Sequence, residues 1–230
     1  MTFMELFFKV LSDAIYYNLI REQRYMLFIN GLGISLQLTF FAALLGIVIG
    51  LIVALIRLTN LKFFNRIASI YVDVIRGTPA VVQLVLIYYA ILGSSNLPKI
   101  VVASIAFGIN SGAYVSELIR AGILAVDKGQ MEAARSLGFS YASSMRYIII
   151  PQAIKNILPA LANEFIVLLK ETAIAGYIAL DDLTRAGNIV RGRTFDAYTP
   201  FILVAVVYLY ITTILTWLMN KMERRMRQSD

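Results

Sequence analysis

Residues 25–56 read YMLFINGLGISLQLTFFAALLGIVIGLIVALI, and none of these side chains carries a charge. A helix of about 20 residues crosses the hydrocarbon core of a bilayer, so this run predicts a span that is tilted or protrudes. Across the chain of 230 residues, 59% of the side chains are hydrophobic and 15% are charged. Soluble domains carry about 25% charged residues. The sequence therefore predicts an integral membrane protein.

Further apolar runs on the carboxyl side of this stretch predict an all-α, multi-pass helical bundle with five transmembrane helices. Their hydrophobicity is continuous, which favours helices over the alternating strands of a membrane barrel. We expect the spans at residues 26–56, 63–92, 100–126, 151–178 and 198–220. The second span is predicted to break at residues 76–79, because Pro79 has no backbone donor and disfavours helix at the preceding residue. The fourth span has the weakest apolar signal.

The positions of the basic residues predict the orientation of the chain. Arg57, Lys62 and Arg66 follow the first span, and a basic tail at residues 221–230 follows the last. By the positive-inside rule these segments are cytoplasmic, which places the amino terminus outside and the carboxyl terminus inside. We expect an amphipathic interfacial helix at residues 1–24 and a transmembrane domain at residues 25–220. The basic flanks explain the net charge of +7, so no nucleic-acid partner is expected.

The residue inventory excludes several kinds of chemistry. The chain has no cysteine and no histidine, which removes the usual ligands of zinc, haem and iron–sulfur clusters. It also lacks the glycine-rich loop with lysine and serine or threonine that holds nucleotide phosphates. We expect no metal, no cofactor and no enzymatic activity in this chain, and any energy source has to lie in another subunit.

The polar segment between the third and fourth expected spans contains a helical hairpin. Residues 129–138 read GQMEAARSLG, and Ile148, Ile150 and Pro151 follow. Residues 131–137 are strong helix formers, Gly138 suits the left-handed residue that ends a helix, and Ser140 can cap the next helix. Ala133 and Ala134 predict a flat face that a partner can approach closely. The alternative is a polar surface hairpin without a partner.

This hairpin resembles the EAA loop of the permease subunits of binding-protein-dependent ABC importers. In that family the pattern is Glu-Ala-Ala, three residues, Gly, nine residues, Ile and, two or three positions on, Pro. The sequence meets each fixed position, although Ile150 stands where many members have Leu. The resemblance implies a type I importer fold in which the cytoplasmic loop 127–150 seats on an ABC ATPase subunit that binds ATP and Mg. The coupling residues it implies are Gly129, Glu132, Ala133, Ala134, Leu137, Gly138, Ile148 and Pro151.

Three further stretches resemble the polar amino acid branch of these permeases, the histidine, glutamine and arginine type. They are residues 76–79 with Gln83-Leu84, residues 112–114 with Glu117 and Arg120, and Asn163-Glu164 with Lys170 and Thr172. The resemblance implies a prokaryotic inner membrane protein that pairs with a second permease chain, identical or related. It also implies an extracellular or periplasmic amino acid binding protein and a polar amino acid as cargo, for which basic amino acids such as arginine, lysine or histidine are one candidate class.

Charges at membrane depth are costly and usually face a bundle interior or a wet cavity. Asp73 with Arg76, and Glu117 with Arg120, can each pair on one helix face at a spacing of three, and local ion pairing is the favoured reading for both. Glu164 has no charged residue three or four positions away, so it needs a partner from another helix, another subunit or the substrate. The candidate substrate path comprises Asp73, Arg76, Gly77, Thr78, Pro79, Glu117, Asn163 and Glu164.

Two other functional classes fit parts of the sequence. An autonomous secondary transporter or channel is favoured by the charges at membrane depth, but it predicts an internal repeat, and no convincing repeat is visible. A membrane-embedded enzyme has only the acidic pair Asp181-Asp182 in its favour. That pair lies in an expected external loop without a nucleophile or a metal-binding partner.

Overall fold

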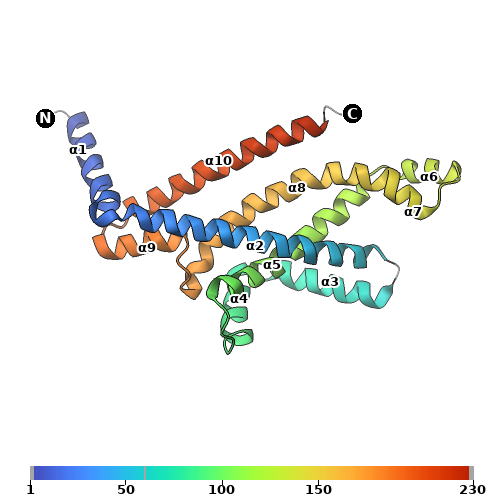
Figure 1. The fold of residues 1–230 in the computed structure, drawn as a ribbon, viewed down its shortest axis with the longest axis horizontal. Coiled ribbons are helices and arrows are strands. Elements are labelled where there is room, and N and C mark those ends of the chain that lie inside the picture. Colours follow the sequence, from blue (N-terminus) through green and yellow to red (C-terminus); the bar gives the residue numbers. More distant parts are fainter. Residues whose placement is uncertain (1–2, 60, 228–230) are drawn as a thin grey trace.

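The computed structural model describes residues 3–59 and 61–227, and this part of the chain is helical throughout and contains no strand (Figure 1). The helices, in chain order, are α1 (Phe3–Ile15), η1 (Tyr16–Ile20), η2 (Arg21–Gln23), α2 (Tyr25–Leu58), α3 (Lys62–Gly77), α4 (Ala80–Val85), η3 (Leu86–Ile91), α5 (Lys99–Leu124), α6 (Lys128–Ser136), α7 (Tyr141–Ser144), η4 (Met145–Ile149), α8 (Ile150–Glu171), η5 (Thr172–Ile178), α9 (Leu183–Thr194) and α10 (Thr199–Arg227).

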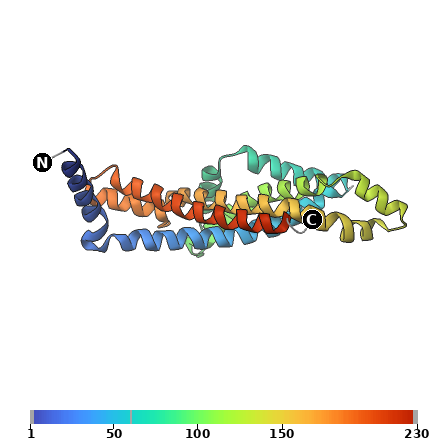
Figure 2. The ribbon, with the colours of Figure 1, turned by 90° about the horizontal axis from the view of Figure 1, so that it is seen from above.

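The molecule is elongated, and its two ends differ in content (Figures 1 and 2). One end carries α1, α9 and the start of α2. The other end carries the α6–α7 hairpin and the turn between α2 and α3, and the carboxyl end of α10 points toward it. The basic segments that follow the first, third and last expected spans are therefore directed toward one end of the molecule.

Helices α2 and α5 form the centre of the bundle, and they approach closely because glycines line their crossing. A Cβ atom placed on Gly50 would lie 2.5 Å from Val115 Cγ1, and one placed on Gly112 would lie 2.7 Å from Ile49 Cγ2. Small residues at a helix crossing let two membrane helices pack backbone to backbone. The crossing fixes α5, which carries several candidate site residues.

Three of the described helices are long and apolar enough to cross a membrane, namely Tyr25–Leu58, Lys99–Leu124 and Thr199–Arg225. They coincide with the first, third and fifth expected spans. The pair Lys62–Gly77 and Ala80–Ile91 passes the same test together and is bent by 107°, which confirms the predicted break in the second span. Helix α8 carries four charged residues and does not belong to this set, so the count of five spans remains a prediction.

The amino-terminal segment is helical over α1 and η1 and then turns sharply into α2. Glu22 and Gln23 have positive φ values of 56° and 54° at this turn. Asn18 is buried, and its amide donates to Asp196 Oδ2 at 2.8 Å, which ties the segment to the loop between α9 and α10. The interfacial position expected for residues 1–24 stays a prediction. Residues 1–2 and 228–230 lie outside the described part of the chain.

Candidate functional site

The predicted hairpin is present at one end of the molecule and is built by local capping (Figure 1). Asp127 Oδ1 accepts a hydrogen bond from the Gly129 amide at 2.7 Å and caps α6. Gly138 adopts a left-handed φ of 87° after α6, as expected. The Ser140 hydroxyl then accepts from the Ser143 amide at 3.1 Å and caps α7. The order of helix, glycine turn and second helix predicted from the sequence is therefore confirmed.

The hairpin presents a mixed face to solvent. Glu132, Ala133 and Leu137 are exposed, and Leu137 shows 79% of its surface although it is apolar. Ala134 differs from the expectation of a two-alanine open face, because it is 1% exposed and packs within its own chain. Only Ala133 of the pair is available to a partner. The open face therefore combines one carboxylate, one small residue and one large apolar residue.

The base of the hairpin packs against the membrane bundle. Ile148 contacts a buried cluster that includes Val126, Ile149 and Ala153. Pro151 stands at the start of α8, directly after η4. These two coupling residues thus lie at the junction between the hairpin and α8, away from its open face.

The break between α3 and α4 is held together by one buried side chain, Gln83. Its amide nitrogen donates to the Ile75 carbonyl at 2.7 Å, to the Thr78 carbonyl at 3.1 Å and to Thr78 Oγ1 at 2.7 Å. Its oxygen accepts from Asn110 of α5 at 2.9 Å. Irregular backbone at membrane depth needs such partners. Gln83 thus satisfies carbonyl groups next to the break and joins the broken span to α5.

Asp73 and Arg76 do not form the ion pair expected from their spacing. Both side chains are exposed on α3, and no ion pair joins them within the described residues. The Arg76 guanidinium lies 5.4 Å from the centre of the Tyr114 ring of α5 instead, a cation–π contact. Gly77, Thr78 and Pro79 are also exposed. This part of the candidate path is therefore exposed along α3 and the break.

Glu117 sits in a three-residue charge cluster. Arg120 Nη2 donates to Glu117 Oε2 at 3.0 Å, which confirms the expected local pair. The other carboxylate oxygen accepts from Arg57, which arrives from the end of α2. Spacing on one helix could not reveal this second arginine, because it lies on another element. The carboxylate is neutralised within the chain.

Glu164 has a different environment. It is half-buried on α8, and the Ser111 hydroxyl of α5 donates to its Oε1 at 3.3 Å. Within the described residues, no cation lies in ion-pair contact with it. The partner does come from another helix, but it carries no charge.

Asn163 does not share the surroundings of Glu164, although the two are adjacent in sequence. Asn163 lines an open pocket of about 180 Å³ between α8 and α10, together with Pro159, Thr216 and Asn220. Glu164 faces α5 instead. The structure therefore separates the two residues onto different sides of α8.

Comparisons with known proteins identify the family. The model of the family "Binding-protein-dependent transport system inner membrane component" matches residues 46–228. The arginine transport system permease protein ArtQ of Bacillus subtilis is 38% identical, with 88% of this chain and 93% of that protein covered. The glutamine transport system permease protein GlnP of Escherichia coli is 36% identical, with 87% and 93% covered.

Solved structures agree with this result. An amino acid ABC transporter crystallised with histidines contains a chain that is 49% identical, with a TM-score of 0.85 and coverage of 90% of this chain and 97% of that one. The MetNI methionine ABC transporter contains a chain with a TM-score of 0.75 at 20% identity, a likeness of fold. The chain therefore belongs to the family of binding-protein-dependent transport system inner membrane components, as an amino acid ABC importer permease.

Proposed function

We propose that the chain forms half of the membrane channel of an ATP-driven importer for polar amino acids, with a second permease chain as the other half. Five spans cross the membrane: α2, the broken pair of α3 with α4–η3, α5, α8 and α10. The amino terminus is outside and the carboxyl terminus is cytoplasmic. The charge distribution supports this orientation, because the basic segments at residues 57–66 and 221–227 are directed toward the end that carries the α6–α7 hairpin.

The observation that carries the proposal is the projecting α6–α7 hairpin with its open face of Glu132, Ala133 and Leu137. A protruding helix with an exposed leucine and a small neighbour suits insertion into a groove of another protein. In this proposal the other protein is an ABC ATPase, which binds ATP and Mg. A binding protein delivers the amino acid at the opposite end. ATP binding moves the hairpins, and the channel alternates between outward-open and inward-open states.

The proposed cargo site is centred on Glu164. Its carboxylate has only a serine hydroxyl as a partner within the described residues, and burying a charge without a counter-ion is unfavourable. An ammonium or guanidinium group of a passing amino acid supplies that counter-ion. The similarity to a named arginine permease and to a transporter crystallised with histidines supports a basic cargo, whereas the comparable similarity to named glutamine permeases supports an uncharged polar one. Asp73 and Arg76 line the approach along α3.

The experiment that tests the function is co-purification of the chain with its second permease chain and its cognate ABC ATPase, followed by measurement of ATP hydrolysis with the binding protein and with arginine, histidine, lysine or glutamine. We expect Glu132→Arg to lower stimulated hydrolysis by about tenfold, which corresponds to about 1.4 kcal/mol at an interface. Asp181→Arg is the matched control, because it makes the same charge change on an exposed acid outside the hairpin.

The outcome separates coupled from autonomous transport. Loss of stimulation in Glu132→Arg together with full stimulation in Asp181→Arg supports the proposal. Amino acid uptake by the reconstituted chain without any ATPase, or stimulation that is equal in both variants, contradicts it and favours an autonomous transporter or channel.

A further inference from the structure

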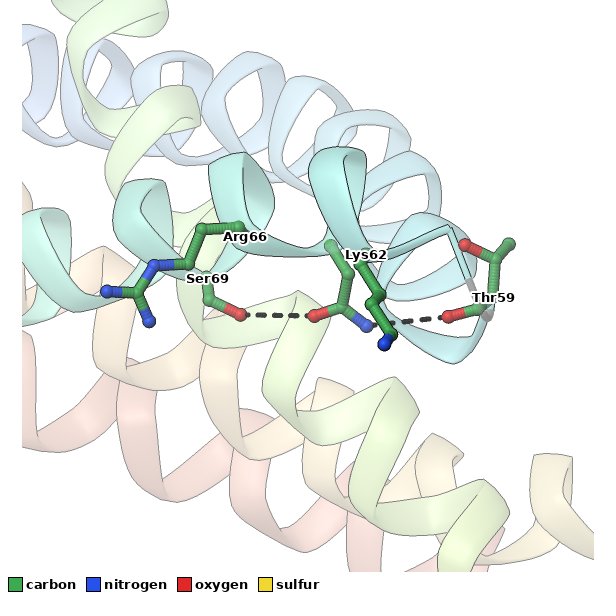
Figure 3. Close-up of a pocket in the computed structure, with 5 residues that line it drawn as sticks. Thr59, Lys62, Arg66 and Ser69 are labelled. Atoms are coloured by element: carbon green, nitrogen blue, oxygen red, sulfur yellow. Dashed lines mark hydrogen bonds between the residues drawn. The ribbon is translucent and has the colours of Figure 1, made fainter.

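The turn between α2 and α3 carries an open pocket that the proposed transport cycle does not use (Figure 3). The pocket has a volume of about 560 Å³ and is lined by Thr59, Lys62, Asn65, Arg66 and Ser69. All five residues are polar, and two of them are cationic. The turn follows the longest apolar helix of the chain, so it lies where a span leaves the membrane.

Asn65 orders the floor of this pocket. Its amide nitrogen donates to the Arg57 carbonyl at 3.1 Å and to the Thr59 carbonyl at 3.5 Å. Its oxygen accepts from the Ser69 hydroxyl at 3.4 Å. These bonds hold the end of α2 against the first two turns of α3 (Figure 3). The pocket is therefore a structured part of the turn.

Lys62 and Arg66 are the two charges of the pocket, and neither is neutralised by another described residue. They stand four residues apart, on one face of α3. No ion pair or hydrogen bond joins either side chain to another described residue. Arg57, only five residues before Lys62, is bound by Glu117 instead. The hydroxyls of Thr59 and Ser69 donate to the Ile56 carbonyl and to Asn65, so the two cations are the groups of the pocket that can bind a phosphate group.

The surface next to the pocket is apolar. Phe63 is 71% exposed and Ile67 is 52% exposed, and both lie on the same two turns of α3 as Lys62 and Arg66. A free phosphate ion makes no favourable contact with such an apolar surface. A phospholipid can contact both the cationic pocket and the apolar surface, because its phosphate binds the cations and its acyl chains pack against the phenyl and aliphatic side chains. Basic pockets beside transmembrane helices on the cytoplasmic side bind anionic lipid headgroups.

We infer that Lys62 and Arg66 bind the phosphate of an anionic phospholipid at the inner membrane surface, with its acyl chains against Phe63 and Ile67. The bound lipid anchors the amino-terminal end of α3, the helix that ends at the break beside Pro79. The site is independent of Glu132 and Glu164. It requires only that the turn lies at the membrane surface, so its failure leaves the proposed cargo and coupling sites untouched.

The test is native mass spectrometry of the full chain, delipidated in mild detergent and titrated with phosphatidylglycerol or phosphatidylcholine. We expect the wild type to prefer phosphatidylglycerol by about thirtyfold, the effect of two cations near an anionic surface. Lys62→Gln with Arg66→Gln should remove the preference, and Lys62→Arg should keep it. Arg224→Gln with Arg225→Gln is the matched control, because it removes two exposed cations of α10 that lie outside the pocket.

Three results overturn the inference. Equal binding of both lipids by the wild type contradicts any anionic site. A loss of preference in the α10 control as large as in the pocket variant shows a diffuse effect of charge. Displacement of phosphatidylglycerol by millimolar inorganic phosphate shows that the ligand is a small anion. An unchanged unfolding temperature of the pocket variant distinguishes lost binding from lost folding.

Discussion

Two carboxylates in the bundle, Glu117 and Glu164, have opposite surroundings. Glu117 accepts hydrogen bonds from Arg57 and Arg120, so its charge is neutralised by the chain itself. Glu164 meets only the Ser111 hydroxyl, and within the described residues no cation contacts it. Glu117 lies on α5 and Glu164 lies on α8, and the two groups differ in whether a cation contacts the carboxylate. The satisfied group serves the fold, and the unsatisfied group is available to a ligand.

The strongest challenge to this comparison is the substitution Glu117→Gln. It leaves two arginines without their counter-ion in a partly buried site, and we expect a loss of about 3 kcal/mol in the free energy of unfolding. Thermal unfolding of the purified chain in detergent measures it. Asp181→Asn is the control, because it removes an exposed pair with Arg185 and should cost about 0.5 kcal/mol or less. Equal unfolding temperatures for the wild type and Glu117→Gln would contradict a structural role.

Gln83→Ala extends the comparison to a second satisfied group. It removes the amide that binds the carbonyls of Ile75 and Thr78 at the break, and it should cost about 2 kcal/mol. Limited proteolysis near residues 77–79, together with thermal unfolding, measures the effect. Gln152→Ala, whose amide binds only one carbonyl of the preceding turn and Gln130, is the control. Equal stability of both variants would mean that Gln83 does not hold the break.

The smallest expected effect is the pH dependence of folding stability that arises from Asp196. Partial burial alone would raise the pKa of this carboxyl group, but hydrogen bonds from Thr199, the Tyr198 amide and Asn18 outweigh it and lower the pKa. A lowered pKa adds stability above the ordinary aspartate value of about 4, and this stability is lost as the pH falls through the lower folded-state value. We expect the unfolding temperature to fall between pH 7 and pH 3. Asp196→Asn should weaken that dependence, and an identical pH profile would contradict it.

The elements that local pattern controls could be predicted from the sequence. The uncharged run at residues 25–56 forms α2. The hairpin turns at Gly138, and Ser140 caps α7. Pro79 broke the second span as expected. In each case the cause lies within a few residues of the effect, because hydrophobic length, caps and proline act on the local backbone.

The elements that depend on tertiary partners could not be predicted. Arg57 reaches Glu117 across 60 positions of sequence, and Gln83 bonds to Asn110 on another helix. Helical spacing suggested a pair of Asp73 with Arg76, but the Tyr114 ring holds Arg76. Ala134 packs inward, although its small side chain next to Ala133 suggested an open face. Helix periodicity orders neighbours along one helix, and it carries no information on which helix lies opposite.

The most direct test of the comparison is amino acid uptake into proteoliposomes that contain the chain, its partner subunits, the ATPase and the binding protein, with wild type set against Glu164→Gln. We predict that Glu164→Gln lowers uptake of the preferred amino acid by at least about tenfold, because a charge-assisted contact worth about 1.5–3 kcal/mol is lost. Its unfolding temperature and its co-purification with the ATPase should stay at the wild-type level. Unchanged uptake kinetics, or a collapse of folding as in Glu117→Gln, would contradict a cargo role for Glu164.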